Sequence, residues 1–270
     1  MNSSGIITLV SDMGHKDYYV AVVKGTILSQ LPDAKIVDIT HEIPPFDIFK
    51  TAFILKNCYK SFPKGSIHII GVNPEINLST SHVVVKHNEH FFIGADNGIF
   101  SLLFDETPTD IYEINIKQDT DDLTFPVKDV FTKVACHLAR GGTPELVARK
   151  TDSVKQVITY QPVFDDNSIR GSVIYIDGYG NLITNITQTM FKTIGKGRAF
   201  SILCRRVKIH ELSKKYGDVP EGEPLALFTS SGYLEIAMNK AVEGAGGGAN
   251  KLFGVNLNDS IIIEFNNNLL

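Results

Sequence analysis

The sequence predicts an α/β protein with two domains: an N-terminal α/β sandwich domain (residues 1–160) and a C-terminal antiparallel β-barrel domain (residues 170–270). Three observations support this prediction. In the N-terminal part, short runs rich in β-branched residues alternate with segments of helical spacing. Residues 161–170 are polar and aperiodic, as a linker would be. After them, strand-like runs are separated by Gly, Asn and Asp clusters, which favours a small antiparallel barrel.

The N-terminal elements follow from the spacing of apolar residues. Two segments have helical periodicity, residues 18–31 and 48–62. Five runs read as strands: residues 6–10, 35–39, 66–72, 82–85 and 91–93. The first run ends at Ser11 and Asp12, just before the first helical segment. Such a strand-to-helix turn is where open α/β sheets usually place ligand-binding groups, so Asp12 and Asp17 are candidates.

The C-terminal part contains only short runs with strand character. They are residues 172–176, 182–186, 198–203, 207–212, 224–229 and 260–265. The tract Gly244–Ala249 has the spelling of a dinucleotide-binding glycine motif, but it follows no strand of a βαβ unit. We therefore assign it no binding role.

Composition excludes several classes of function. The formal net charge is −4, the pI is near 6.1, and no block of Lys and Arg occurs, so we expect no nucleic-acid partner. No apolar run is long enough to span a membrane and none resembles a signal peptide, so we expect a cytoplasmic protein with no membrane contact. Cys58, Cys136 and Cys204 are widely spaced and odd in number, which predicts reduced, buried thiols. No His, Asp or Glu cluster has ligand spacing, so we expect no metal.

A series of motifs in a fixed order resembles one known family. The motifs are residues 11–14, 24–25, 36–47, 96–98, 179–185 and 230–237. With them the chain resembles the S-adenosylmethionine (SAM) hydroxide adenosyltransferases, which are related to the enzymes that make 5′-fluoro- and 5′-chloro-deoxyadenosine. The resemblance implies the two domains described above. It also implies a homotrimer whose ligand lies between domains of neighbouring subunits.

Asp12 is the candidate for ribose recognition. A carboxylate can accept hydrogen bonds from both vicinal hydroxyls, and such charge-assisted pairs are strong. The resemblance favours this role for Asp12. The alternative is a helix N-cap, or a charge near a helix N-terminus that the helix dipole favours.

A second group of candidates lies around residue 180. By resemblance, Asp177 and Asn181 bind the methionine and adenosine groups, and Tyr179 packs near the purine, where stacking adds about 1 kcal/mol. The alternative is a structural turn, because Asp-Gly is also a strong hairpin signal.

Further positions match ligand-binding positions of the halogenating relatives. Ser230 and Ser231 match a Ser-Arg pair that holds the methionine carboxylate, and the loss of Arg implies a weaker grip. Phe46 falls where those relatives have a Trp beside the ligand, although a buried core Phe would account for it equally well. Phe125 is expected to form a wall of the reaction centre.

The expected catalytic centre departs from the family pattern. Hydroxide-transferring members carry an Asp, an Arg and a His that act on the attacking water, and the matching residues here are Asn73, Thr80 and Pro126. An amide has no useful proton affinity near neutral pH, Thr carries no charge, and Pro has no side-chain donor. Halide transfer is also disfavoured, because Asn73 replaces a Tyr and Val127 replaces a small residue. We place Asn73 and Thr80 on the nucleophile side of the site.

Substitute bases are available nearby. They are Glu75, His82, Lys128 and Asp129, although a solvated loop Glu and a structural His are the ordinary interpretations.

Two hypotheses of different class follow. The first is an enzyme that hydrolyses SAM to adenosine and methionine by attack at ribose C5′, with SAM as substrate and no cofactor. The alternative is a catalytically inactive protein that binds SAM or adenosine. Transfer to or from another nucleophile, such as a thiol or phosphate, ranks last because no basic residue is found at the positions we can assign.

Overall fold

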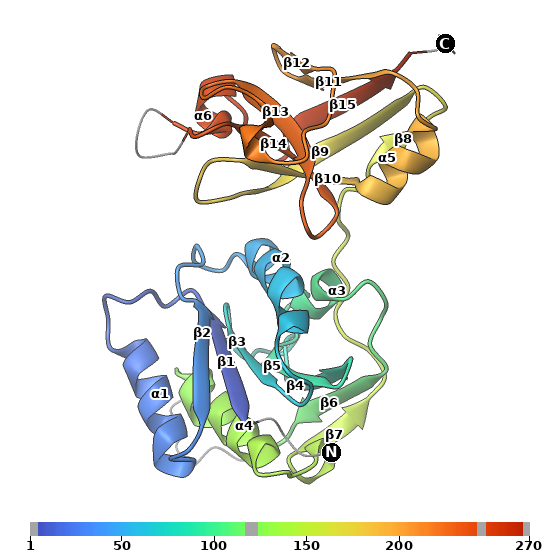
Figure 1. The fold of residues 1–270 in the computed structure, drawn as a ribbon. Helices are drawn as coiled ribbons and strands as arrows, with labels where there is room; N and C mark the ends of the chain where they lie inside the picture. Colours follow the sequence, from blue (N-terminus) through green and yellow to red (C-terminus); the bar gives the residue numbers. More distant parts are fainter. Residues whose placement is uncertain (1–4, 117–123, 242–246, 267–270) are drawn as a thin grey trace. The chain divides into compact units, whose positions relative to one another are not determined.

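The computed structural model describes residues 5–116, 124–241 and 247–266, and the chain forms two compact units (Figure 1). Unit 1 is Met1–Ile158 and unit 2 is Thr159–Leu270. Among the described residues, no helix is long and apolar enough to cross a membrane.

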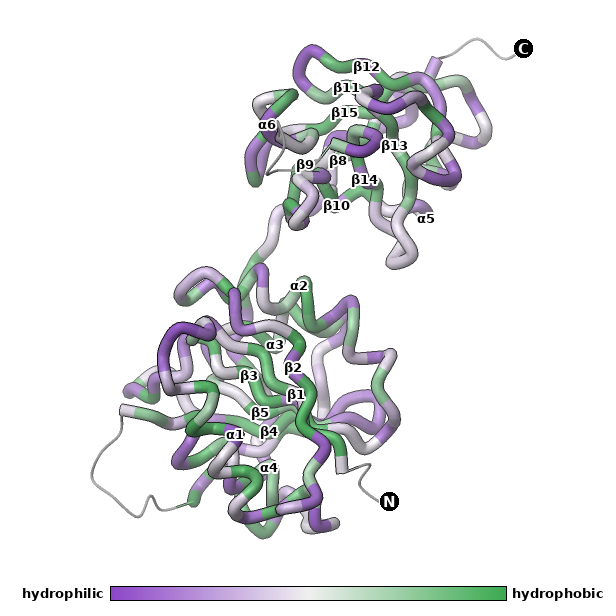
Figure 2. The backbone as a smooth tube through the Cα atoms, turned by 60° about the vertical axis from the view of Figure 1, so that its left-hand side comes forward, coloured by the Kyte–Doolittle hydropathy of each residue, from purple (hydrophilic) through white to green (hydrophobic). Residues whose placement is uncertain are grey.

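Unit 1 is built on a seven-stranded sheet with the order β2-β1-β3-β5-β4-β6-β7. The first four strands in this order are parallel, and β4, β6 and β7 add antiparallel pairs. The strands are β1 Ile6–Ser11, β2 Lys35–Thr40, β3 Ile67–Gly71, β4 His82–His87, β5 His90–Ala95, β6 Asp110–Ile114 and β7 Ala148–Thr151. Figure 2 shows the central strands as largely apolar, as expected for strands buried on both faces.

Helices cover both faces of this sheet. They are α1 Tyr19–Gln30, α2 Ile48–Cys58, α3 Ile99–Leu103 and α4 Thr132–Ala139, with short turns η1 Tyr59–Ser61, η2 Val127–Phe131 and η3 Pro144–Leu146. Buried residues of α1 and α4 pack with Ile7 and Leu9 of β1 in one core. Buried residues of α2 and α3 pack with Val10 of the same strand in a second core. Unit 1 is therefore an α/β sandwich.

The strand order gives unit 1 a topological switch point. From β1 the chain passes through α1 to β2 on one side, and then through α2 to β3 on the other side of β1. At such a point two loops leave the sheet in opposite directions, and a crevice opens between the carboxyl ends of the strands. Here these ends are Ser11 of β1 and Gly71 of β3.

Unit 2 is an antiparallel sheet with the order β12-β11-β15-β9-β10-β14-β13, and β8 pairs with β9. Strands β12 and β13, at the two ends of this order, lie next to each other, so the barrel is nearly closed. Its strands are β8 Val163–Phe164, β9 Ser168–Ile176, β10 Leu182–Thr187, β11 Phe200–Cys204, β12 Val207–Ile209, β13 Pro224–Phe228, β14 Tyr233–Met238 and β15 Ser260–Phe265. The helices are α5 Gln188–Gly195, η4 Tyr216–Asp218 and α6 Ala249–Phe253.

The predicted fold class is confirmed, with local differences. Residues 168–170, which we expected within a linker, belong to β9, because Ile169 is buried in the barrel core and pairs with Ile263. Elements β6, β7, β8, β14 and α3 to α6 were not predicted. Cys136 and Cys204 are buried thiols as expected, whereas Cys58 is only half-buried. Burial raises the pKa of Cys58 and of Cys204 to about 11.

Candidate functional site

The candidate residues of unit 1 gather at the carboxyl edge of the parallel strands. Asp12 follows β1 and Asn73 follows β3, which places them on the two sides of the switch point. Thr80 lies just before β4, whose first residue pairs with Ala95 at the carboxyl end of β5. Residues far apart in the sequence thus lie at one edge of the sheet.

Asp12 is held by the segment that precedes α2. Its Oδ2 accepts a hydrogen bond from the backbone N–H of Phe46 at 2.9 Å. Each carboxylate oxygen has two lone pairs, so Asp12 retains capacity for further donors. The N-cap alternative is wrong, because α1 begins at Tyr19 and Tyr18 occupies its N-cap.

Two residues at this edge have positive φ angles. Phe46 has φ 67° and Asn73 has φ 46°. A positive φ is rare for a bulky side chain and is a feature of functional loops, whereas Asn tolerates it well. The Phe46 side chain is not in the core: it is 67% exposed, so the buried-Phe alternative is wrong. Asn97 holds the backbone at Asn73 by donating Nδ2 hydrogen bonds to the carbonyls of Val72 and Asn73.

The loop that carries Thr80 is stabilised by hydrogen bonds between its own residues. The backbones of Asn77 and Thr80 pair with each other, and Thr80 is buried. His82 is also buried, and its Nε2 lies 2.8 Å from the carbonyl oxygen of Pro74. Burial lowers the pKa of His82 despite this contact. These contacts agree with a structural role for His82. Glu75 lies on the same loop and is exposed.

Phe125 and Pro126 lead into the η2 turn on the α1 side of the edge. The Phe125 ring meets the Tyr19 ring edge to face, with centroids 5.5 Å apart. Pro126 is buried and occupies the N-cap of η2. Lys128 and Asp129 form an ion pair with each other at 3.0 Å.

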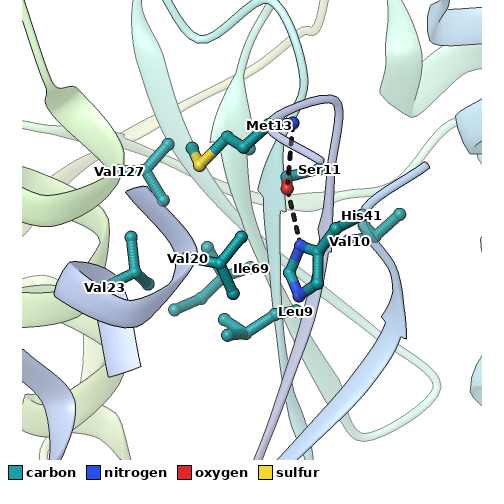
Figure 3. Close-up of a pocket in the computed structure, with 10 residues that line it drawn as sticks. Leu9, Val10, Ser11, Met13, Val20, Val23, His41, Ile69 and Val127 are labelled. Carbon is teal, nitrogen blue, oxygen red and sulfur yellow. Dashed lines mark hydrogen bonds between the residues drawn. The ribbon is translucent and has the colours of Figure 1, made fainter. Parts of the chain in front are cut away.

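A chain of polar contacts begins at Ser11, the residue before Asp12. Ser11 Oγ lies 2.7 Å from His41 Nδ1 and accepts a hydrogen bond from the Met13 N–H at 3.4 Å (Figure 3). His41 Nε2 lies 3.1 Å from Asp38 Oδ1, and Lys24 Nζ lies 2.5 Å from Asp38 Oδ2. The contact of Nε2 with Asp38 is bent, so this nitrogen lacks a well-aligned hydrogen bond.

The charges of this chain follow from burial. Burial lowers the pKa of His41, and the nearby Asp38 offsets only part of this effect. Partial burial raises the pKa of Asp38, but the contacts with Lys24 and His41 outweigh it and leave the pKa below its usual value. Sequence reasoning missed this chain, although Lys24 and residues 36–41 lie in motifs that carry the family resemblance.

In unit 2, Asp177 organises the turn between β9 and β10. Its Oδ1 accepts hydrogen bonds from the backbone N–H groups of Tyr179 and Asn181 at 2.9 and 2.8 Å. Its Oδ2 accepts from Asn181 Nδ2 at 3.1 Å. Asp177 thus has the turn-shaping contacts of the alternative interpretation, while the Tyr179 side chain is 63% exposed and Asn181 is buried.

This turn packs against the end of the glycine tract. The Asn250 N–H donates to the Gly180 carbonyl at 2.9 Å. A Cβ at Gly248 would lie 2.2 Å from the Tyr179 carbonyl oxygen and 2.6 Å from Gly180 Cα, so only Gly fits there. Residues 244–246 of the tract lie outside the described residues. Its described end supports the turn by close backbone packing.

Ser230 and Ser231 form the exposed tip of the β13–β14 hairpin. Further along β14, Glu235 is only 4% exposed and accepts a hydrogen bond from the Tyr216 hydroxyl at 2.8 Å. Burial raises the pKa of Glu235, and the negative charge of Asp177 adds to this increase. Sequence reasoning assigned no role to Glu235. A Glu at a buried strand position is the signal that could have found it.

No group of three His, Cys, Asp or Glu side chains among the described residues could hold a metal ion. The groups available at both candidate regions are hydrogen-bond acceptors, amides and aromatic rings. They suit a polar organic ligand with hydroxyl donors and an aromatic ring.

The fold and these regions define a two-domain protein, in which an α/β sandwich with a polar switch-point edge precedes an antiparallel barrel. The family models for the N-terminal and C-terminal domains of SAM hydroxide adenosyltransferases match residues 7–148 and 171–262. The chain belongs to the SAM hydroxide adenosyltransferase family and is an enzyme of that family, as predicted.

Named relatives cover most of the chain. An (R)-S-adenosyl-L-methionine hydrolase of Methanocaldococcus jannaschii is 29% identical over 96% of both chains. One from Thermus thermophilus is 28% identical over 87% of this chain and 92% of its own. A fluorinase of Nocardia brasiliensis is 27% identical over 87% and 91%. A crystal structure of an uncharacterised Thermotoga maritima protein aligns with a TM-score of 0.85 and 29% identity, over 95% of this chain and 99% of its own.

Proposed function

We propose that this enzyme hydrolyses SAM to adenosine and methionine by attack of water at ribose C5′. The observation that carries the proposal is the switch-point edge of unit 1. There the Asp12 carboxylate and the Asn73 loop follow the neighbouring strands β1 and β3, in a chain of this family. The relatives named SAM hydrolases support water rather than halide as the second substrate.

The chemistry makes modest demands on side chains. Methionine leaves from a sulfonium as a neutral thioether, so the leaving group needs no protonation. Water forms the C5′–O bond as the C5′–S bond breaks, and its proton is released to solvent. The protein must hold water in line with the C5′–S bond and exclude bulk solvent, and proximity and desolvation then supply much of the acceleration. Asn73 and Thr80 suit this task, because an amide and a hydroxyl can both orient a water molecule.

Each ligand group has an assigned residue. Asp12 accepts the ribose hydroxyls, with Phe46 and Phe125 as apolar walls of the reaction centre. Tyr179 packs on the purine and Asn181 binds the adenosine. Asp177, Ser230 and Ser231 bind the methionine end.

The alternative function is a catalytically inactive protein that binds SAM or adenosine. It is favoured by one observation: each candidate substitute base is either exposed or engaged. His82 contacts the Pro74 carbonyl, Lys128 pairs with Asp129, and Glu75 is solvated.

The test combines calorimetry with product analysis. Purified protein is titrated with SAM and, separately, with adenosine, and the SAM mixture is then analysed by chromatography. Release of adenosine and methionine at equal rates supports hydrolysis. Binding with intact SAM would support the inactive alternative, and no binding of either compound would refute both.

The Asp12→Ala variant tests the ribose assignment. We expect adenosine binding to weaken by about 1.5–3 kcal/mol, because two charge-assisted hydrogen bonds are lost. Asp33→Ala, which changes an exposed carboxylate in the turn before β2, is the control. Unchanged adenosine affinity in Asp12→Ala would remove Asp12 from the site.

The assembly and location implied by the resemblance complete the proposal. We expect a homotrimer with the site between subunits, a cytoplasmic location, and no cofactor or nucleic-acid partner. Sedimentation equilibrium of the full chain tests the trimer, since a monomeric mass would leave each site incomplete.

A further inference from the structure

The contacts of Ser11, His41, Asp38 and Lys24 form one continuous chain across three elements. Lys24 lies on α1, Asp38 near the end of β2, His41 directly after β2, and Ser11 at the end of β1. Residues that come from separate elements and meet in a polar chain fix those elements relative to one another. This chain fixes α1 and β2 to the end of β1, immediately before Asp12.

The order Ser, His, Asp is also that of a nucleophilic triad, but burial excludes that role. Ser11 and His41 are 3% and 2% exposed. The cavity they line has room for about 10 Å³, which is no more than one water molecule. Its other walls are apolar: Leu9, Val10, Met13, Val20, Val23, Ile69, Gly71 and Val127 (Figure 3). A substrate cannot reach the Ser11 hydroxyl.

The backbone contacts of His41 point instead to the turn that carries Asp12. The Gly14 N–H donates to the His41 carbonyl at 2.8 Å, and the Ile43 N–H donates to the Ser11 carbonyl at 3.4 Å. The Met13 N–H donates to Ser11 Oγ. Met13 is thus held by the Ser11 side chain and Gly14 by the His41 main chain, and Asp12 lies between Ser11 and Met13.

The direction of the hydrogen bonds depends on the tautomer of the neutral ring, and the contact with Asp38 favours a proton on Nε2. With Nε2–H facing Asp38, Nδ1 accepts from the Ser11 hydroxyl, and Ser11 Oγ remains free to accept from Met13 N–H. The groups that face the ring are Asp38 of β2, Lys24 of α1, Ser11 of β1 and the His15 ring, whose centroid is 5.0 Å away.

We propose that His41 is a positioning residue that fixes the Asp12 carboxylate for the ribose hydroxyls through Ser11 and the turn at residues 11–14. This inference rests on the proposed function, in which Asp12 binds ribose. His41 touches no substrate atom and acts only through Asp12.

A double-mutant cycle tests the proposal, with the adenosine dissociation constant as readout. The variants are His41→Phe, Asp12→Ala and the double variant. We expect His41→Phe to raise the dissociation constant about tenfold in the wild-type background and less than about twofold in the Asp12→Ala background. The exposed His210→Phe is the matched control and should change neither value.

The outcomes separate this inference from the proposed function. Equal losses in both backgrounds would mean that His41 is merely structural and would overturn the proposal. If Asp12→Ala alone has no effect, the ribose role of Asp12 fails first, and the proposal fails with it. Should His41→Phe not fold, Ser11→Ala replaces it, with a loss of roughly threefold expected only when Asp12 is present. A loss independent of Asp12 would again overturn the proposal.

Discussion

Glu235 is a buried carboxylate whose charge has a cost in unit 2. It accepts a hydrogen bond from Tyr216, and burial raises its pKa. When folding raises the pKa of a group, the free energy of unfolding of the protein decreases as the pH rises through that pKa. The hydrogen bond from Tyr216 offsets only part of the effect of burial on Glu235. Burial and Glu235 together raise the pKa of the Tyr216 hydroxyl.

The Glu235→Gln variant tests whether that charge serves the ligand. We expect the variant to be more stable than wild type at about pH 8, because a neutral amide avoids the buried charge. SAM is cationic and adenosine is neutral. We therefore expect SAM binding to weaken by about 1 kcal/mol, roughly fivefold, and adenosine binding to be unchanged, as measured by calorimetry. The exposed Glu211→Gln is the control. Equal losses for both ligands would contradict a charge effect.

At the level of single residues, the sequence indicated which residues are candidates for the site, but not whether their side chains are exposed or what they contact. Asp12, Asn73 and Thr80 follow from motifs, and the strand-to-helix turn places Asp12 at the sheet edge. The exposure of Phe46 could not be predicted, because an aromatic residue in an apolar segment favours the core on average. Nor could the contact of His41 with Ser11, because the sequence does not specify which strand is the neighbour of β1.

The Asp177 turn depends on the loop before α6. Gly248 lies so close to Tyr179 and Gly180 that an added Cβ would collide with backbone atoms. Backbone cannot rotate away as a side chain can, so one of the two segments would have to shift. The position of Asp177 is thus determined by a segment distant from it in the sequence.

The Gly248→Ala variant should therefore disturb both stability and binding. We expect a loss of about 1–3 kcal/mol in the free energy of unfolding. We also expect weaker SAM binding, because the turn must move. Urea unfolding and calorimetry measure the two effects. Gly217→Ala is the matched control in the same unit, since a Cβ there meets nothing within 4 Å. If Gly248→Ala and Gly217→Ala had the same free energy of unfolding and the same SAM affinity, the loop before α6 could shift without destabilising unit 2.

Elements with strong periodicity were predictable, and those stabilised by distant contacts were not. The runs at β1 and β3 are almost wholly apolar, and both strands form as predicted. Strand β14 was missed because its hairpin tip was interpreted as a ligand segment. The linker was placed too far along the chain, because Ser168 and Arg170 are polar. Pairing of β9 with β15 makes them strand residues regardless of their polarity.

A cluster of neutral histidines affects the pH stability of the molecule. His68 is fully buried between Thr8 and His90, at 2.7 and 3.1 Å. Burial and the neighbouring His90 lower the pKa of His68 to about 3. The unfolded chain takes up a proton near pH 6.5 and the folded chain does not. The stabilisation is therefore complete above pH 6.5 and decreases as the pH falls from 6.5 toward 3.

The His68→Gln variant should reduce this pH dependence. Between about pH 7.5 and pH 5.0, His68 accounts for a loss of about 2 kcal/mol in the free energy of unfolding, which the neutral amide removes. Urea unfolding at the two pH values measures the difference. The exposed His210→Gln should leave the loss unchanged. A His68→Gln variant with the full loss would mean that His68 titrates in the folded protein.

The carboxyl edge of the unit 1 sheet combines a residue held by the core with an exposed loop. Asp12 is held by the ends of β1 and β2 and by the turn before α2, all of them tied into the two cores. Asn73 and Thr80 lie on the loop between β3 and β4, which is exposed from Glu75 to Ser79. Substitutions at the exposed positions of this loop therefore carry little folding penalty, so mutation there can change the chemistry while Asp12 keeps its place. Members of one fold can in this way change the reaction they catalyse while they still bind the substrate.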